Sequence, residues 1–148
     1  YNSNTRFGFD LQQNLTISSA YNIQFINNYN LDEAAVVLTN ATTITIVKPG
    51  LYRFGIIGFR HNETAPVATA TSATFSLSVT VNGKQYRVIP TDGQKGAAST
   101  WNYVNATTFL FDLFVPANST ITMNAVSSNG NSFFKSDSGH FFGYSITD

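Results

Sequence analysis

Apolar and polar residues alternate with a period of two along most of the chain, which is the pattern of β-strands with one buried face. The clearest run has Phe75, Leu77, Val79 and Val81 alternating strictly with Ser and Thr. The segment 31–38 admits a helical turn, but its β-branched residues favour a short strand. No segment has the period of an amphipathic helix of useful length. Strands are therefore predicted at 6–11, 21–26, 31–38, 43–47, 51–60, 75–81, 84–89, 107–115, 120–125 and 141–146.

Turn residues separate these runs. Pro49-Gly50 divides 43–47 from 51–60, because Pro fixes φ and Gly permits positive φ. Asn82-Gly83 directly follows an alternating run and predicts a type I′ hairpin, because both residues tolerate positive φ. Weaker signals predict a break at 27–28, a turn at 116–119, and loops at 61–73, 90–100 and 129–139.

The predicted strands are of two kinds. Those at 75–81 and 120–125 are apolar on one face, whereas those at 51–60, 109–115 and 141–146 are apolar on nearly both faces. We expect each kind to gather in its own sheet, so that one sheet is apolar on both sides. One face of that sheet fills the sandwich, and the other needs a covering layer or another subunit.

The strand at 51–60 shows the two faces most clearly. Tyr52, Phe54, Ile56 and Gly58 share one face, and Leu51, Arg53, Gly55, Ile57 and Phe59 share the other. The alternation does not say which of the two faces the core. The aromatic content, 14% of residues with 13 Phe, suits either a rich core or an aromatic interface between subunits.

About eight to ten short strands with regular turn signals predict an antiparallel sandwich or barrel. The 148 residues suit one domain at 1–148, with 1–20 as a leading strand or arm. Because the chain begins with Tyr1 rather than Met, we expect it to be the C-terminal part of a longer chain.

The amino-acid composition excludes several classes of binding partner for this chain. Only 11% of residues are charged, and eight Lys and Arg balance eight Asp and Glu. The absence of a basic cluster argues against nucleic acid, which requires dense Lys and Arg. No apolar run approaches the length of a membrane helix, so no membrane insertion is expected. The sequence contains no Cys, which excludes disulfides and Cys-bound metals.

Candidate catalytic chemistry is sparse. The only two histidines are His61 and His140, with no metal-binding or nucleophile-elbow spacing. Asp137, Ser138 and His140 are neighbours in sequence on a predicted loop, and such neighbours rarely hold triad geometry. A calcium site at Asp92 or Asp137 is an alternative, but the acidic residues are scattered along the sequence. We predict no enzyme, no cofactor and no metal.

Three other features have both a structural and a functional interpretation. Arg53 and Asp112 are lone charges in apolar strands, and an unpaired buried charge is costly, so we predict that they pair. Trp101 and Tyr103, with Asp92, could bind a sugar, although capping of the sandwich edge is favoured. Five Asn-x-Ser/Thr sequons, at Asn14, Asn40, Asn62, Asn105 and Asn118, carry little weight in a chain so rich in Asn and Thr.

An ordered set of motifs resembles the jelly-roll head shared by the globular domain of complement subcomponent q and the tumour necrosis factor superfamily. The resemblance covers about residues 21 to 148. It departs from the family where Ala117-Asn118 stands in place of a Gly-Asp turn, and in lacking an acidic cluster for calcium. The matching motifs are Ile44-x-Ile46-x-x-Pro49-Gly50-Leu51-Tyr52-x-Phe54, the strand into Val81-Asn82-Gly83-Lys84, Phe111-x-Leu113 through 116–119 into Ile121, and the closing Phe141-Phe142-Gly143-Tyr144-Ser145-Ile146.

Within that family the Asn- and Thr-rich, Cys-free character resembles bacterial members, such as the C-terminal domains of collagen-like exosporium glycoproteins of the BclA type. The resemblance implies a compact homotrimer at the end of a collagen-like stalk, on a bacterial spore or cell surface. We therefore expect a non-enzymatic trimerisation and surface-presentation head. The alternative is a carbohydrate- or receptor-binding head, lectin-like or from a phage, on the same trimeric fold.

The trimer interface, or the inner sheet, is expected to involve the strands that are apolar on both faces. The candidate residues are Leu51, Tyr52, Arg53, Phe54, Ile57, Phe59, Phe109, Phe111, Asp112, Phe114, Phe142, Tyr144 and Ile146.

Overall fold

The computed structural model describes most of the chain. It covers residues 5–12, 15–17, 20–64, 72–94, 102–127, 132–135 and 139–146. Side chains are described at 5–12, 20–57, 77–86, 108–126 and 139–146. None of the described segments forms a helix that could cross a membrane.

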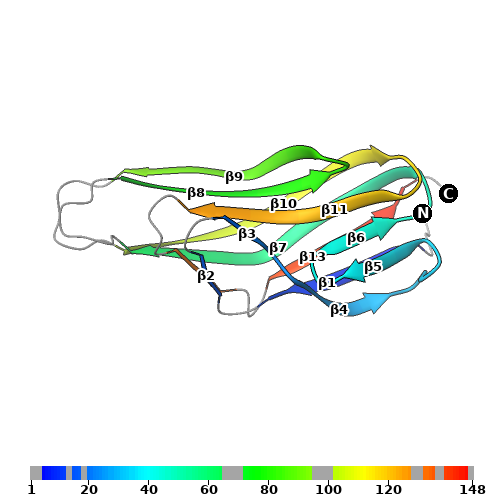
Figure 1. The fold of residues 1–148 in the computed structure, drawn as a ribbon, viewed down its shortest axis with the longest axis horizontal. Helices are drawn as coiled ribbons and strands as arrows, with labels where there is room; N and C mark the ends of the chain where they lie inside the picture. The colour runs from blue at the N-terminus through cyan, green and yellow to red at the C-terminus, as the bar shows by residue number, and fades with distance from the viewer. Residues whose placement is uncertain are drawn as a thin grey trace.

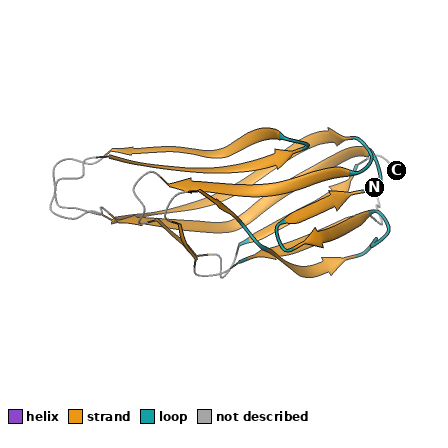
Figure 2. Ribbon diagram, in the orientation of Figure 1, coloured by secondary structure: helices purple, strands orange, loops and turns teal. Residues whose placement is uncertain are grey.

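The described residues form thirteen β-strands. These strands lie in two antiparallel sheets, which Figures 1 and 2 show packed face to face. The first sheet contains β1 (Arg6–Leu11), β2 (Leu15–Ile17), β4 (Phe25–Asn30), β7 (Gly50–Thr64), β10 (Asn102–Val115), β12 (Ser132–Lys135) and β13 (His140–Ser145). The second contains β3 (Ala20–Asn22), β5 (Val36–Asn40), β6 (Thr43–Ile46), β8 (Ser72–Val81), β9 (Lys84–Gln94) and β11 (Ser119–Ser127).

Neighbours in each sheet are often distant in sequence. The first sheet has the order β2-β12-β7-β13-β1-β4, with β10 also paired to β7. The second has the order β5-β6-β11-β8-β9, with β3 also paired to β11. The chain crosses from the second sheet to the first at Pro49-Gly50, between β6 and β7. The predicted turn at Pro49-Gly50 is therefore one of the connections between the two sheets.

The predicted division of the strands is confirmed. The strands that are apolar on both faces are β7, β10 and β13, and all three lie in the first sheet. The strands that are apolar on one face are β8 and β11, and they pair with each other in the second sheet. The first sheet therefore has a second apolar face that does not contribute to the core of the sandwich.

The core lies between the sheets and is rich in aromatic rings. Phe54 is fully buried, and its ring centroid lies 5.4 Å from that of Phe111 and 5.9 Å from those of Tyr52 and Phe141. The second sheet contributes aliphatic side chains such as Ile44, Leu77 and Met123, all fully buried. Much of the aromatic content is thus used in the core.

The predicted Asn-Gly hairpin is confirmed. Asn82 and Gly83 have φ of 51° and 81°, and Val81 pairs with Lys84. The Asn82 side chain also reaches the neighbouring turn, where Nδ2 donates to Ser119 Oγ at 2.9 Å and Oδ1 accepts from the Thr120 amide at 3.0 Å. The hairpin is therefore held both by backbone conformation and by the adjacent strand.

Several predicted boundaries are wrong because strand pairing extends beyond the apolar runs. The predicted loop at 61–73 begins inside β7, whose residues to Thr64 pair with β10 and β12. The predicted loop at 90–100 begins inside β9, which tolerates Pro90 because β9 is an edge strand. The predicted loop at 129–139 contains β12. Polar residues in these segments are compatible with strands because their backbone groups are satisfied across the sheet.

Two further boundaries near the N-terminus also differ. The predicted strand at 21–26 is divided into β3 and β4, and β4 continues through Asn27 and Asn28 as an edge strand paired with β1. In the segment 31–38 the first part is a turn, since the amides of Ala35 and Val36 donate to Asp32 O. Only its second part is strand, because β5 begins at Val36.

Candidate self-association surface

The outer face of the first sheet carries the surplus apolar residues. Across β4, β1, β13, β7 and β10 the paired positions form rows, because residues opposite each other in a ladder point to the same side. We call this surface the outer face. Its apolar members are Ile26, Tyr29, Leu51, Ile57, Leu110, Phe114, Phe142 and Tyr144.

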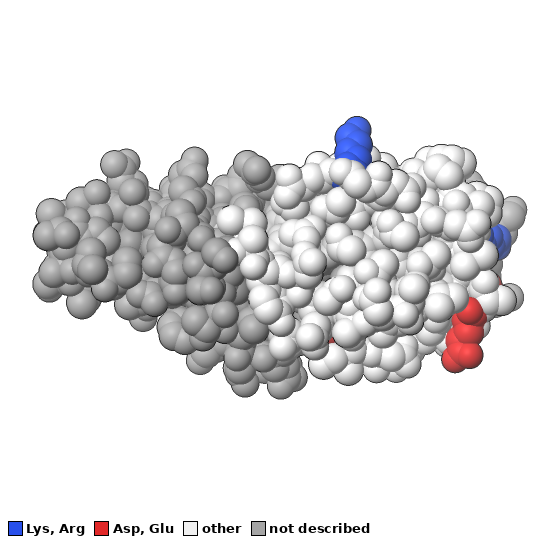
Figure 3. Space-filling model, in the orientation of Figure 1, with Lys and Arg blue, Asp and Glu red and all other residues white. Residues whose placement is uncertain are grey.

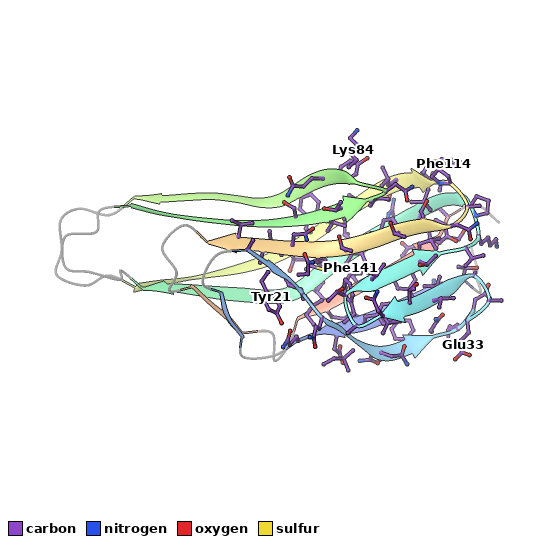
Figure 4. All side chains as sticks on the ribbon, in the orientation of Figure 1. Tyr21, Glu33, Lys84, Phe114 and Phe141 are labelled. Atoms are coloured by element: carbon purple, nitrogen blue, oxygen red, sulfur yellow. The ribbon has the colours of Figure 1, made fainter. Side chains whose placement is uncertain are left out.

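The most exposed members belong to β10. Phe114 is 63% exposed and Leu110 is 57% exposed, and Ile57 on the neighbouring β7 is 42% exposed. Figure 4 shows Phe114 at the periphery of the sandwich, in contrast to Phe141 between the sheets. Exposure of several large apolar side chains on one face of a sheet is unusual for a surface in contact with water alone.

A polar row crosses this apolar surface. It consists of Arg6, Tyr144, Arg53 and Asp112, which lie opposite one another in successive ladders. Arg53 Nε donates to Asp112 Oδ1 at 2.7 Å, and Arg53 Nη2 donates to Asp112 Oδ2 at 2.9 Å. The guanidinium of Arg6 lies 5.2 Å from the centre of the Tyr144 ring. The predicted pairing of Arg53 with Asp112 is confirmed.

The ion pair stabilises the charged forms of both side chains and thereby shifts the pKa of each. The hydrogen bonds from Arg53 lower the pKa of Asp112 below its usual range; desolvation opposes this shift, and the charge of Arg53 adds to it. The bonds to Asp112, and then to Tyr144, raise the pKa of Arg53. Both side chains remain about two-fifths exposed, at 43% and 41%. The pair is thus formed but still accessible to a partner.

A second polar cluster lies at the β4 side of the outer face. His140 Nδ1 lies 2.9 Å from Asp10 Oδ1, and Asn28 Nδ2 donates to both oxygens of Asp10 at 3.0 and 3.2 Å. Burial raises the pKa of Tyr29, against the opposing charge of Arg6. Together with the polar row, this cluster gives the apolar outer face fixed polar positions that a docking partner must match.

Two glycines make room for side chains from neighbouring strands to lie over their backbone. A Cβ at Gly55 would come within 2.2 Å of the Phe142 ring and 2.8 Å of Leu110. A Cβ at Gly8 would come within 2.4 Å of the Tyr29 ring and 2.6 Å of His140. The absence of a Cβ at these positions therefore allows the side chains of the outer face to pack as they do.

The structure divides the predicted interface residues between the two faces. Tyr52 and Phe54 are buried in the core, and Phe109 and Phe111 lie opposite the core residues Ile56 and Phe54. Ile146 follows β13, half-buried, and its amide donates to Leu51 O. The side chain of Phe59 lies outside the described residues. The predicted residues on the outer face are Leu51, Arg53, Ile57, Asp112, Phe114, Phe142 and Tyr144.

Some residues of the outer face were not predicted from the sequence. Leu110 has the same parity as Asp112 and Phe114, so its position could have been recognised from the alternation. Tyr29 and His140 had no such signal, because they join the surface only through the pairing of β4, β1 and β13. The residues predicted from sequence therefore cover the β7 and β10 side of the surface better than the β4 side.

The predicted ligand-binding residues cannot be placed as a site. Trp101 lies outside the described residues, as do the side chains of Tyr103 and Asp92, whose backbones belong to β10 and β9. A hollow of about 310 Å³ on the outer face is lined by Arg53, Leu110, Phe111 and Asp112. In the part of the chain that the structure describes, no three His, Asp or Glu side chains gather in a metal-binding arrangement.

Comparison with known proteins identifies the fold. No protein-family model matches the sequence, and a search of curated proteins finds no match. Among solved structures, the chain is similar to Eiger TNF from S. frugiperda, with a TM-score of 0.60 and 9% identity over 99% of this chain and 95% of that one. It is also similar to murine APRIL, with a TM-score of 0.59 and 7% identity over 96% of this chain and 98% of that one. The predicted all-β jelly roll is thereby confirmed.

Proposed function

On the premise of a TNF-like jelly roll, we propose that this chain is a non-enzymatic head domain that assembles into a homotrimer through the outer face. The observation that carries the proposal is the exposure of Leu110 and Phe114 on a sheet whose other side already fills the core. The occupant is a second copy of the chain, since the resemblance noted in the sequence implies a threefold trimer.

The contrast between the two outer surfaces supports this choice. The second sheet exposes hydroxyl and amide side chains, which bond to each other: Thr80 Oγ1 donates to Asn124 Oδ1 at 2.9 Å, and Asn124 bonds to Asn22. Few charged side chains of the described residues appear on the face that Figure 3 shows. A polar face of this kind is well solvated, so the apolar outer face of the first sheet is the better candidate for burial.

Burial of the outer face would supply the driving force. Complete burial of a Leu or Phe side chain is worth about 1.5–3 kcal/mol. The polar row and the second polar cluster around Asp10 would add specificity, because a misaligned partner would remove water from these polar groups without offering them hydrogen bonds. Apolar contacts thus provide affinity, and the ion pair selects the orientation.

The biological setting that we propose is the end of a collagen-like stalk on a bacterial spore or cell surface. Its support is the ordered set of motifs in the sequence and the geometry of the strands that begin and end the sandwich. The start of β1 lies beside the end of β13, where the Ser145 amide donates to Thr5 O at 3.0 Å (Figure 1). A stalk that enters before β1 would therefore approach one end of the head, and the opposite end would be presented outward.

Light scattering coupled to size-exclusion chromatography tests the assembly. We expect the wild-type chain at micromolar concentration to have three times the protomer mass. The double variant Leu110→Ser/Phe114→Ser should be monomeric at the same concentration, because two exposed apolar side chains of the outer face are lost. A monomeric wild-type chain would refute the proposal.

A matched variant on the other sheet controls for general effects of polarity. Val126 is 40% exposed and belongs to β11 of the second sheet. Val126→Ser should leave the trimer intact, and circular dichroism should show that all variants keep their strands. Equal dissociation of both variants would place the interface elsewhere.

A further inference from the structure

The structure distinguishes between sequons that are equivalent in the sequence. We propose that Asn40, at the turn between β5 and β6, is an acceptor for N-linked glycosylation on the folded domain. The ligand class is an oligosaccharide transferred from a polyprenyl diphosphate donor. This inference is independent of the proposed self-association.

The conformation of the turn carries the proposal. Asn40 and Ala41 are exposed. Asn40 Oδ1 accepts hydrogen bonds from the Thr42 amide at 2.9 Å and from Thr42 Oγ1 at 3.1 Å, which forms an Asx turn. Both bonds use the side-chain oxygen of Asn40. The amide nitrogen, which is the reacting atom, takes no part in them.

These bonds also favour the chemistry. A hydrogen bond to the amide oxygen draws electron density from the nitrogen and makes its protons more acidic. In the transfer, Asn40 Nδ2 forms a bond to the anomeric carbon of the sugar and loses a proton to a base of the transferase. The bond between that carbon and the diphosphate oxygen breaks, and polyprenyl diphosphate leaves. No oxidant or reductant is required.

The sequon at Asn118 also has Asn at its first position and Thr at its third, but its conformation is unsuitable for an Asx turn. Asn118 has φ of 59°, in the left-handed region. The amide of Thr120, which would close an Asx turn, donates instead to Asn82 Oδ1 at 3.0 Å. Ser119 is buried, and its Oγ donates to Pro116 O. Folding therefore removes the hydrogen bond that the Asn40 sequon retains.

The other sequons in described segments lie within strands. Asn62 pairs with Val104 on one side and with Phe133 on the other, so its backbone is inside the first sheet. Asn105 pairs with His61. An extended, paired backbone cannot bend into an Asx turn without breaking its ladder. Asn14 lies outside the described residues.

The position of Asn40 is compatible with assembly. It ends β5, an edge strand of the second sheet, whereas the outer face belongs to the first sheet. The tip of the turn is held to β4, because the Phe25 amide donates to Ala41 O at 2.7 Å. A sugar on Asn40 would therefore extend from a fixed turn at the edge of the second sheet.

In vitro transfer to the folded chain tests the proposal. The chain is produced in a host that does not N-glycosylate proteins, then incubated with an oligosaccharyltransferase and a polyprenyl-diphosphate-linked oligosaccharide. Intact mass and peptide mapping locate the sugar, and an acceptor peptide confirms that the enzyme is active. We expect a sugar on Asn40 and none on Asn62, Asn105 or Asn118, and we expect the Asn40 sugar to be lost in Asn40→Gln and Thr42→Val.

Comparison of folded and unfolded chains isolates the role of the turn. Unfolded chain should accept sugar at Asn118 as well as at Asn40, whereas folded chain should accept it at Asn40 alone of these two. Asn82→Gly keeps the hairpin's positive φ and frees the Thr120 amide, so it should increase transfer to Asn118 on folded chain. Failure of the folded chain to accept sugar at Asn40, where the unfolded chain does so, would overturn the proposal. Equal transfer to Asn118 in the folded wild-type chain would overturn it as well.

Discussion

Arg53 and Asp112 lie directly opposite each other on β7 and β10 and form two hydrogen bonds in the middle of an apolar surface. They are 59 residues apart in sequence. An exposed pair of this kind adds little to the stability of one protomer. Its position among Leu110, Phe114 and Tyr144 instead suits a surface that becomes buried on assembly.

Breaking this pair should weaken the trimer more than the protomer. In Arg53→Met the carboxylate of Asp112 would be buried without a partner in the trimer, whereas in a monomer it would remain hydrated. Sedimentation equilibrium should therefore show strong dissociation, and chemical denaturation should show a small change in protomer stability. The double variant Arg53→Met/Asp112→Leu should recover association, since no lone charge remains. Unchanged association of Arg53→Met would mean that the pair stays solvated in the trimer.

The pair should also give a defined pH dependence. The pKa of Asp112 is lower in the folded chain than its unfolded value, which is about 3.9. Its contribution to stability is thus complete above that value and is lost as the pH falls through the lower, folded pKa. The difference in unfolding free energy between wild type and Asp112→Asn should be constant from neutral pH to about pH 5 and should vanish in strong acid. A difference that grows on acidification would contradict the assignment.

Gly143 and Gly55 should respond differently to an added methyl group. A Cβ at Gly143 would come within 2.6 Å of Phe7 and 2.9 Å of Phe54, and both rings are fully buried. Gly143→Ala should therefore cost about 1–3 kcal/mol of protomer stability through overpacking. Gly55→Ala would displace Phe142 and Leu110 on the outer face, where they can rotate into solvent, so its main effect should be on association. Urea unfolding and light scattering separate the two effects.

Phe54 and Phe114 offer a second matched comparison between core and surface. Phe54 contacts four aromatic rings and is fully buried, so Phe54→Ala should destabilise the protomer by about 3–5 kcal/mol. Phe114 is 63% exposed, so Phe114→Ala should change protomer stability by much less and association by more. Similar unfolding midpoints for both variants would mean that Phe114 already has a partner within its own chain.

The hairpin at Asn82-Gly83 should depend on backbone conformation rather than on space. Nothing lies within 4 Å of a Cβ at Gly83, but φ there is 81°. Gly83→Ala should cost about 1–2 kcal/mol, because an L-residue with a Cβ is strained in the left-handed region. Gly83→Asn should cost less, since Asn tolerates that region. Thermal or urea unfolding of the two variants provides the measurement, and equal losses would contradict this explanation.

The sequence predicted the β-strands well and their ends poorly. The alternation located β8 and β11, and the Asn-Gly pair located the hairpin. It did not predict that β7 continues to Thr64 or β9 to Gln94, because those ends are polar and resemble loops. Their backbone bonds come from partner strands elsewhere in the chain, and such pairing leaves no local signal.

The candidate surface was only partly predictable for a related reason. Arg53 and Asp112 were recognised because each is a lone charge on an apolar strand, and Phe114 because its strand is apolar on both faces. Tyr29 and His140 look ordinary in sequence, and they become part of the outer face only because β4, β1 and β13 are neighbours. Likewise, the sequons are alike in sequence, and only the turns and ladders around them make Asn40 different from Asn118.

The sequence by itself determined that the chain is an antiparallel β-sandwich or barrel, that its strands are of two kinds, and that β7, β10 and β13 are apolar on nearly both faces. These properties follow from the period-two alternation and from residues that fix turn conformation, which are local. Only the tertiary structure decided that Tyr52, Phe54 and Ile56 face inward while Leu51, Arg53 and Ile57 face outward. Alternation defines two faces of a strand, but the second sheet that covers one of them comes from distant parts of the chain.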